Sequence, residues 1–364
     1  MAGVYISYPF CRQKCVYCNF ASGVGSPPAE RDYLEALRAE IAAHEWEWTP
    51  ETVYLGGGSP DRLEPAALEC LLGLVPGRPW REATIEAAPD DVTPEKAAAW
   101  ARCGITRASL GVQSFVEAEI RRTGRRHTAA MVEAAAGMLR EAGVGSINID
   151  LIAGLPGQTP ASWEESLEWV ERIAPGHVSV YMLEIDGKSR LGRELLAGGS
   201  RYGAAEVPDE ETVALLYERA VAALAGMGLR RYEISNFARP GEESVHNLKY
   251  WRLEPYVGFG ADAHSYDGRM RRRNAETARD YVDRFRRGLP PTVETSDAAP
   301  DERFFLGLRL AEGIQLEAGD RERHAAAIER FLRDGLLEEA GGRLRLTDRG
   351  VLLSNEVFQE FLAA

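Results

Sequence analysis

The sequence predicts an α/β fold: a partial barrel of six strand-helix units, followed by a helical, winged-helix-like C-terminal region. Short apolar, strand-like segments alternate with helical ones over roughly the first 185 residues, which is typical of a parallel sheet. Polar or glycine residues repeatedly stand where these segments end, as they do in ligand-binding barrels. The chain of 364 residues is long enough for one large core and a smaller one.

Six segments are predicted to be the strands of the barrel. Each is rich in β-branched or other apolar residues and is bounded by turn-forming or polar residues. Six units are fewer than the eight of a closed barrel, so we expect an open one. The predicted strands are VYISYPF (4–10), TVYLGGG (52–58), ATIEAAP (83–89), RASLGVQSF (107–115), INIDLIAGLPG (147–157) and HVSVYML (177–183).

The segments between these strands are predicted to be helices that cover the sheet. In PPAERDYLEALRAEIAAHE, Leu34, Leu37 and Ile41 recur at helical spacing behind two prolines that suit a first turn. The alternation ends after the sixth strand. A long helix is then expected at 210–227, followed by a short strand, RRYEISNF, and a loop that carries HNLKYW.

The tail from Asp301 is predicted to form helices and a two-strand turn centred on Gly341 and Gly342, which resembles a winged helix. Winged helices often bind DNA, but this acidic chain has no basic recognition helix, so a packing role is favoured. We therefore expect three parts: a barrel with an N-terminal cysteine loop (1–200), a barrel-completing segment with HNLKYW (201–300), and a winged-helix-like domain (301–364).

The composition is that of an acidic, globular protein. Its net charge of −13 disfavours nonspecific binding of nucleic acid or anionic lipid, and the basic run Arg271–Arg273 is predicted to be a solvated strand or turn. No apolar run approaches the roughly 20 residues of a membrane span. The N-terminal segment shows no secretory signal. We therefore expect a cytoplasmic protein with reduced cysteines.

Three of the five cysteines stand within eight positions, in CRQKCVYC. Cys11, Cys15 and Cys18 lie on one predicted loop, where their thiolates can bind a single soft metal centre. A structural zinc ion would require a fourth ligand. The remaining two, Cys70 and Cys103, fall in helical runs as buried small hydrophobes. Three thiolates on a four-iron cluster would leave one iron open to a small ligand.

This loop resembles that of the radical S-adenosylmethionine superfamily, whose C-x3-C-x2-C spacing is matched by CRQKCVYC, with the aromatic Tyr17 before the third cysteine. The resemblance implies a [4Fe-4S] cluster held by the three cysteines, S-adenosylmethionine at its open iron, and an electron donor for the cluster. GGGSP after the second strand supports it, since glycines let the backbone approach the methionine amine without a Cβ in the way.

The resemblance extends over nearly the whole chain to the branch that contains oxygen-independent coproporphyrinogen III oxidase and the HemW haem chaperones. GVQSF, TGRRHT, NIDLIAGLPGQT, YEISNFARPG and HNLKYW carry it. It implies that Arg125 pairs with the methionine carboxylate, that Glu86 binds the ammonium, and that two further residues hold ribose hydroxyls. The full set implied for the S-adenosylmethionine pocket is Tyr5, Tyr17, Gly57, Gly58, Ser59, Glu86, Gln113, Arg125 and Asp150.

Two positions depart from the usual pattern of this branch. Ser59 stands where the family usually has threonine, which retains the hydroxyl group. Ala88 stands where the family usually has asparagine, so any side-chain hydrogen bond from that position is absent. We expect the binding of S-adenosylmethionine to survive both changes.

Three features favour a haem chaperone over a coproporphyrinogen dehydrogenase. The dehydrogenases typically carry a further cysteine where this chain has Phe20, and a long N-terminal extension where this chain has ten residues before Cys11. HNLKYW resembles the H-N-x-x-Y-W motif associated with haem in HemW, which implies His246 as a ligand of the haem iron and Tyr250 and Trp251 as porphyrin contacts. Alternatively, His246 bonds to backbone beneath the barrel while the two aromatic residues fill a core.

The predicted function is that of a haem chaperone that hands haem, or a related tetrapyrrole, to an acceptor protein. The alternative is an oxygen-independent coproporphyrinogen III dehydrogenase or another radical enzyme that acts on a tetrapyrrole. A DNA-binding regulator that senses redox state through its cluster is a third hypothesis. The other histidines carry weaker expectations: His127 orients Arg125, His264 lies in a glycine-rich turn, and His44, His177 and His324 are surface or loop residues.

Overall fold

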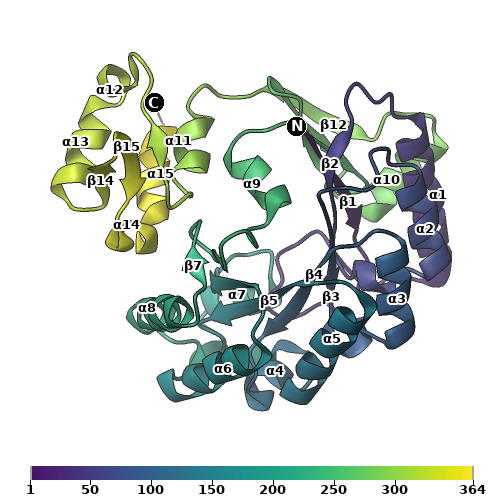
Figure 1. Cartoon of the computed structure of the whole chain (residues 1–364), viewed down its shortest axis with the longest axis horizontal. Coiled ribbons are helices and arrows are strands. Elements are labelled where there is room, and N and C mark those ends of the chain that lie inside the picture. The colour runs from purple at the N-terminus through teal and green to yellow at the C-terminus, as the bar shows by residue number, and fades with distance from the viewer. Residues whose placement is uncertain (1, 363–364) are drawn as a thin grey trace.

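The computed structural model describes residues 2–362, and its centre is a twelve-stranded sheet that curves into an open barrel (Figure 1). The six predicted strands are all present, in sequence order, each parallel to the next. The predicted partial α/β barrel is therefore confirmed. Its strands are β1 (Ala2–Tyr8), β2 (Pro50–Gly57), β3 (Glu82–Ala87), β4 (Arg107–Gln113), β5 (Ser146–Ala153) and β6 (His177–Met182).

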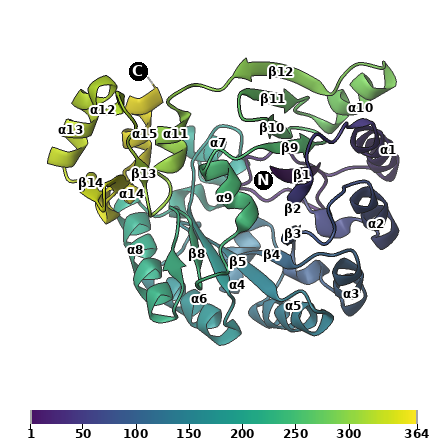
Figure 2. The same cartoon turned by 45° about the horizontal axis from the view of Figure 1, so that its top comes forward.

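Helices cover the outer face of these strands (Figure 2). The main core lies between the two layers, where Ile85, Trp100 and Trp163 are almost completely buried. The helices and short 3-10 turns of this layer are α1 (Pro27–Ala43), η1 (Pro60–Arg62), α2 (Pro65–Gly73), η2 (Pro89–Asp91), α3 (Pro94–Arg102), α4 (Glu117–Thr123), α5 (Ala129–Ala142) and α6 (Pro160–Ile173).

Local sequence determines where these helices begin and end. The Ser26 hydroxyl accepts a hydrogen bond from the Ala29 amide, and two prolines follow it in the first turn of α1, as predicted. Thr159 and Ser162 cap the start of α6 reciprocally. Gly143 ends α5 in the left-handed conformation, with φ of 94°, which glycine adopts without strain.

The sheet extends beyond the six strands at both edges. Next to β6 lie the short antiparallel strands β8 (Asn236–Ala238) and β7 (Arg230–Arg231). RRYEISNF is therefore two strands rather than the one predicted, because the Glu233 side chain accepts hydrogen bonds from the Ser235 amide (2.8 Å) and Asn236 Nδ2 (2.7 Å) in a turn. Next to β1 lie β9 (Tyr256–Phe259), which is parallel to it, and then β10 (His264–Tyr266), β11 (Met270–Asn274) and β12 (Thr292–Asp297).

The HNLKYW segment is a helix, α9 (Val245–Trp251), and not the predicted loop. Glu82, the first residue of β3, accepts hydrogen bonds from the amides of Val245 and His246 (both 2.9 Å) and so holds the start of this helix. Because Glu82 begins its strand, α9 lies at the N-terminal end of the barrel. The other helical elements of this part are α7 (Arg190–Leu196), η3 (Arg201–Glu206), α8 (Glu210–Gly226) and α10 (Ala278–Arg286).

The C-terminal region packs helices around a three-stranded sheet, at the yellow end of the chain in Figure 1. Its predicted two-strand turn is present, with Gly341 and Gly342 both at positive φ between two antiparallel strands. The elements are α11 (Glu302–Gly307), β13 (Ile314–Gln315), α12 (Asp320–Arg323), α13 (Ala325–Arg333), β14 (Leu337–Ala340), β15 (Arg343–Leu346), α14 (Asp348–Leu352) and α15 (Ser354–Leu362).

Two expectations about burial are wrong. Cys70 is exposed rather than buried, whereas Cys103 is buried as predicted. His177, expected at the surface or in a loop, begins β6 inside the barrel and is 1% exposed. His324 lies in the turn between α12 and α13, as a loop residue would, but it is buried: its ring centroid is 4.4 Å from that of Phe304, and its Nε2 atom lies 3.0 Å from Asp301 Oδ1.

No helix among residues 2–362 combines the length and the apolar character that a membrane crossing requires.

Candidate functional site

The three clustered cysteines lie on the loop between β1 and α1, at the C-terminal ends of the parallel strands. A hydrogen bond from the Cys11 amide to the Gly23 carbonyl (2.9 Å) ties the two sides of this loop together. Burial, and then the neighbouring thiols of Cys18 and Cys15, raise the pKa of Cys11. Cys11 therefore lies within electrostatic reach of both other cysteines.

This set of donors fits an iron-sulfur cluster better than a single metal ion. Within residues 2–362, no three histidine, cysteine or acidic side chains are arranged to hold one ion. A four-iron cluster does not need such convergence, because each thiolate binds a different iron atom. Lys14 and Arg62 lie nearby and favour the thiolate form of Cys11.

Arg125 connects the cysteine loop to the strands. Its Nη1 donates a hydrogen bond to the Gly111 carbonyl (2.6 Å), and its Nε donates to the Tyr17 hydroxyl (3.3 Å). Burial opposes the charge of this guanidinium, but Tyr17 and Cys15 beside it outweigh that effect, so the pKa of Arg125 is raised. A fixed positive charge therefore stands next to the cysteine loop, where an anionic ligand group would be stabilised.

Replacing Arg125 with alanine should weaken the binding of S-adenosylmethionine by about 2 kcal/mol, because the ligand carboxylate would lose a buried cationic partner. Calorimetric titration of the anaerobically reconstituted protein measures this. Arg126→Ala is the matched control, since Arg126 is exposed next to it. Equal affinities for the two variants would contradict a role for Arg125 in the pocket.

The glycine-rich turn after β2 packs against the cysteine loop. The Gly58 amide donates to the Tyr8 carbonyl (2.8 Å), and the Ser59 amide donates to the Phe10 carbonyl (2.9 Å). A Cβ at Gly58 would lie 2.6 Å from the Phe10 carbonyl oxygen. Glycine is thus needed for a close backbone approach, as the sequence indicated, but at Gly58 the approaching group is the protein's own backbone.

Glu86 stands at the end of β3 and faces this turn. It accepts hydrogen bonds from the Gly57 amide (3.1 Å) and from the Tyr54 hydroxyl (2.9 Å). Burial raises its pKa to about 7. An ammonium group beside Glu86 would favour the carboxylate form and gain a charge-assisted hydrogen bond.

Gln113 and Asp150 lie on adjacent strands on the far side of the same opening. Asp150 pairs in register with Gly111, whose carbonyl binds Arg125. Asp150 accepts hydrogen bonds from Asn148 Nδ2 (2.7 Å) and Ser109 Oγ (3.1 Å). Gln113 adopts a positive φ of 72° at the end of β4, a conformation that costs energy for a residue other than glycine.

All nine residues predicted for the S-adenosylmethionine pocket thus lie on the first five strands or on the loops at their C-terminal ends. The ring of Tyr5 stacks on that of Tyr54, with centroids 6.0 Å apart. His127 lies nearby and bonds through Nε2 to the Val112 carbonyl (3.0 Å). Burial, with Arg125 close by, lowers the pKa of His127 to about 4, so its imidazole is neutral at pH 7.

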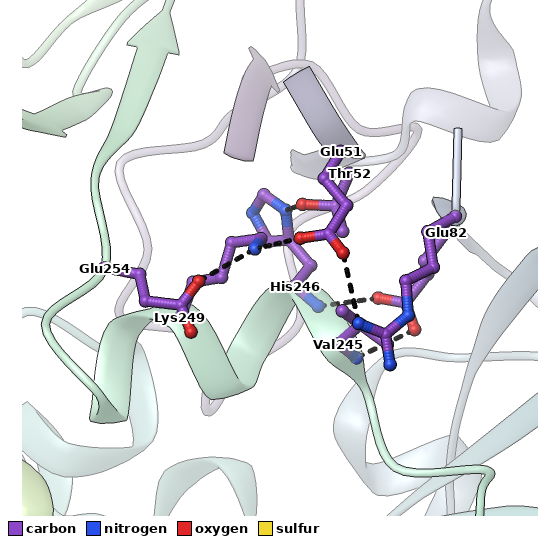
Figure 3. A network of polar contacts seen from close by, with 8 residues as sticks. Glu51, Thr52, Glu82, Val245, His246, Lys249 and Glu254 are labelled. Carbon is purple, nitrogen blue, oxygen red and sulfur yellow. Dashed lines mark hydrogen bonds and ion pairs between the residues drawn. The ribbon is translucent and has the colours of Figure 1, made fainter. Parts of the chain in front are cut away.

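The predicted haem residues lie at the other end of the barrel. His246 is 1% exposed, and both of its ring nitrogens have partners. Nδ1 is 2.8 Å from Thr52 Oγ1, and Nε2 is 2.8 Å from the Tyr250 hydroxyl. The ring also packs on that of Tyr54, with centroids 5.2 Å apart. Figure 3 shows His246 pointing from α9 toward β2.

A buried ion pair fixes the middle of α9 to the same strands. Lys249 is 2% exposed, and its Nζ lies 2.7 Å from Glu51 Oε2 and 3.0 Å from Glu254 Oε2 (Figure 3). Glu51 also pairs with Arg81 (3.1 Å). A buried ammonium with two carboxylate partners holds the helix in one register on the barrel.

Acid should destabilise the protein through His246. Burial, with the nearby charge of Lys249, lowers the pKa of this imidazole to about 3. An unfolded chain protonates near pH 6.5 and therefore binds more protons between these values, so stability falls as the pH drops. The advantage of the wild type over His246→Gln in urea unfolding should shrink by about 2 kcal/mol between pH 7 and pH 5. A constant advantage would mean that His246 titrates normally in the folded protein.

Tyr250 and Trp251 line a cleft of about 430 Å³ between α9, the β9–β11 strands and α11. Apolar and aromatic side chains dominate it, and Arg271 is its one basic residue among those described. Arg271 donates two hydrogen bonds to Glu302 of α11. Tyr250 therefore stands between this cleft and His246 Nε2.

Sequence reasoning missed several residues that position these side chains: Thr52, Tyr54, Glu82, Lys249 and Glu51. Thr52 and Tyr54 stand in the quoted strand TVYLGGG, and Lys249 occupies a variable position of H-N-x-x-Y-W, whereas Glu51 and Glu82 lie outside the quoted segments. Polar residues at the first positions of two neighbouring buried strands, Glu51, Thr52 and Glu82, were the available signal, since buried polar groups require partners.

The comparisons with known proteins agree over the whole chain. The profile of the "Radical SAM superfamily" matches residues 5–170, and that of the "HemN C-terminal domain" matches residues 295–353. A protein named "Heme chaperone HemW" from Bacillus subtilis is 34% identical, over 100% of this chain and 99% of its own length. A protein of the same name from Mycobacterium tuberculosis is 35% identical over 99% and 94%, and one from Escherichia coli is 31% identical over 99% and 98%.

Among solved structures, coproporphyrinogen III oxidase (HemN) from Escherichia coli, described as a radical SAM enzyme, matches with a TM-score of 0.85. The match covers 99% of this chain and 89% of that one, at 22% sequence identity. At this identity the likeness concerns the fold.

Proposed function

Since the chain belongs to the radical S-adenosylmethionine superfamily and, within it, to the family of the HemW haem chaperones, we propose that it binds haem and transfers it to an acceptor protein. The superfamily implies a [4Fe-4S] cluster and S-adenosylmethionine. The single observation that carries the haem proposal is the cleft beside α9, which is lined by Tyr250 and Trp251 of HNLKYW.

In this proposal Cys11, Cys15 and Cys18 would hold the cluster, and the pocket beside them would hold S-adenosylmethionine. When bound, the cluster supplies an electron, which an external donor must replace. Arg125 holds the ligand carboxylate and Glu86 holds the ammonium. Ribose hydroxyls are placed by Gln113 and Asp150, and Tyr5, Tyr17, Gly57, Gly58 and Ser59 complete the pocket.

Haem binds in the cleft, with Tyr250 and Trp251 against the porphyrin and His246 as the ligand of the iron. Since the Tyr250 hydroxyl occupies Nε2 (2.8 Å), the iron must displace that hydroxyl to reach the imidazole. The lowered pKa of His246, caused first by burial, keeps the imidazole neutral and able to ligate at pH 7. Arg271 could bind a haem propionate group. In the present structure the Glu302 carboxylate takes the place that a propionate would occupy beside it.

Phe20 supports chaperone activity over coproporphyrinogen oxidation. The dehydrogenases of this branch typically carry a further cysteine at this position, and here the side chain is an apolar ring that is 67% exposed. We place the activity in the cytoplasm, because reduced thiols are maintained there. Haem or a related tetrapyrrole and an acceptor protein are the partners in this proposal.

Two assays on anaerobically reconstituted protein test the function. With reductant, S-adenosylmethionine and coproporphyrinogen III, the protein should form no protoporphyrinogen IX. Mixed with hemin, it should develop a shifted Soret band that decays when an apo-haemoprotein is added. Formation of protoporphyrinogen IX at a catalytic rate would favour the dehydrogenase instead, and the absence of hemin binding would remove the chaperone proposal.

A further inference from the structure

A continuous chain of buried and partly buried hydrogen bonds runs inside the barrel from the start of α9 to Asp150. The Ser244 amide donates to the Tyr232 hydroxyl oxygen (3.2 Å), and that hydroxyl lies 2.8 Å from His177 Nε2. His177 Nδ1 lies 2.7 Å from Asn148 Oδ1. Asn148 Nδ2 then donates to Asp150 Oδ1 (2.7 Å). His177 lies outside the motifs quoted for the family resemblance, and Tyr232 is the first residue of one of them, YEISNFARPG.

The direction of every proton in this chain is fixed by its two ends. The Ser244 amide can only donate. Burial raises the pKa of Asp150, while hydrogen bonds from Ser179, Asn148 and Ser109 favour its carboxylate form, and as a carboxylate it can only accept. Tyr232 therefore accepts from Ser244 and donates to His177 Nε2, which leaves the proton of the imidazole on Nδ1. Nδ1–H donates to Asn148 Oδ1, and so the Asn148 amide nitrogen faces the carboxylate. Each group has one consistent role, as expected of a fully satisfied buried network.

The Asn148 amide is the one group of this network that could adopt a second, unfavourable orientation. Turned by 180°, the side chain would present Oδ1 to the Asp150 carboxylate and repel it. Ser109 and Ser179 also contact Asn148 Nδ2 (2.7 and 3.1 Å), but their hydroxyls can donate or accept and so do not distinguish the two orientations. His177 Nδ1–H is a fixed donor and does distinguish them.

We propose that His177 is a positioning residue for S-adenosylmethionine: it holds the Asn148 amide in the orientation that fixes Asp150 for the ribose hydroxyls, and Tyr232 ties this setting to the start of α9. The inference rests on the proposed function in one respect, the ribose contact of Asp150. It adds a structural link from the pocket at one end of the barrel to the HNLKYW helix at the other.

Two substitutions of His177 distinguish this hydrogen-bonding role from a role in packing alone. Asparagine carries its amide nitrogen near the place of histidine Nδ1 and can still donate to Asn148, whereas glutamine carries its amide near the place of Nε2. His177→Asn should bind S-adenosylmethionine within about 3-fold of the wild type, and His177→Gln should bind about 10-fold more weakly. Calorimetry on reconstituted protein measures both, with melting temperature and iron content recorded for each variant.

Tyr232→Phe gives a second test that does not alter His177. It should weaken S-adenosylmethionine binding about 3-fold, because Nε2 loses its donor and the tautomer is no longer fixed. Tyr217→Phe is the control, since Tyr217 is a more buried tyrosine whose hydroxyl donates to the Ile234 carbonyl, outside this chain of bonds. Control affinity should equal that of the wild type.

Equal affinities for His177→Asn and His177→Gln, together with an unchanged Tyr232→Phe, would overturn the proposal. Asp150→Ala, measured alongside, distinguishes this outcome from failure of the proposed function. If Asp150→Ala binds weakly while the His177 variants do not differ, the positioning role alone is wrong. If Asp150→Ala binds like the wild type, the ribose role of Asp150 is wrong and the positioning role falls with it.

Discussion

Replacing Cys15 with alanine should remove most of the iron from the reconstituted protein. The wild type should carry about four irons per chain, because three thiolates and one open site are the ligand set of a [4Fe-4S] cluster in this superfamily. Two thiolates leave two irons without a protein ligand. Chemical assay of iron and sulfide after anaerobic reconstitution and gel filtration measures the difference.

The control for this experiment is Cys70→Ala. Cys70 is exposed on α2, away from the cysteine loop, so the variant has the same number of cysteines as Cys15→Ala but should keep the iron content of the wild type. Equal iron in Cys15→Ala and Cys70→Ala would mean that iron binds nonspecifically and that the loop holds no cluster.

Replacing His246 with alanine should abolish the shifted Soret band of the hemin complex and should also lower the stability of the protein by about 3 kcal/mol. Both effects come from the same atoms. The substitution removes the proposed iron ligand, leaves a cavity beside Tyr54, and leaves the buried Thr52 and Tyr250 hydroxyls without their imidazole partner. Spectrophotometric titration and urea unfolding measure the two effects separately.

Two further variants separate the loss of a ligand from general destabilisation. Thr52→Val removes the partner of Nδ1 and should destabilise the protein without preventing ligation, because Nε2 is retained. Tyr250→Phe removes the hydroxyl that occupies Nε2 and should bind hemin at least as tightly as the wild type. Hemin binding by His246→Ala with an unchanged spectrum would place the iron ligand elsewhere and return His246 to a purely structural role.

The order and direction of the barrel strands could be predicted from the sequence because parallel strands are buried on both faces and read as short apolar runs. The ends of helices were predictable where capping residues stand next to prolines, as at Ser26. The turn between β7 and β8 was missed, because it depends on the side chain of Glu233, which bonds to the two residues that follow.

The cysteine loop and the positions of the pocket residues could be inferred because motif spacing places them at the ends of consecutive strands. The helix α9 could not, since its start is held by Glu82, more than 160 residues earlier in the chain. His177 was expected at the surface or in a loop for a similar reason. A histidine at the start of a strand gives no local sign of burial, and its partners Asn148 and Tyr232 come from two other elements.

The placement of α9 at the first residues of the strands has a consequence for chemical compatibility. A Cβ at Gly3, near the start of β1, would lie 3.1 Å from His246 Cε1, while the cysteine loop follows the last residue of the same strand. A strand of this length spans roughly 20 Å. An iron porphyrin held at His246 would therefore lie at the opposite end of the strand from the cluster, and the Tyr54 side chain, which packs on His246 and donates to Glu86, would stand between the porphyrin and the ligand pocket. The same chain could then hold an oxidisable porphyrin and a source of carbon radicals without the radicals damaging the porphyrin.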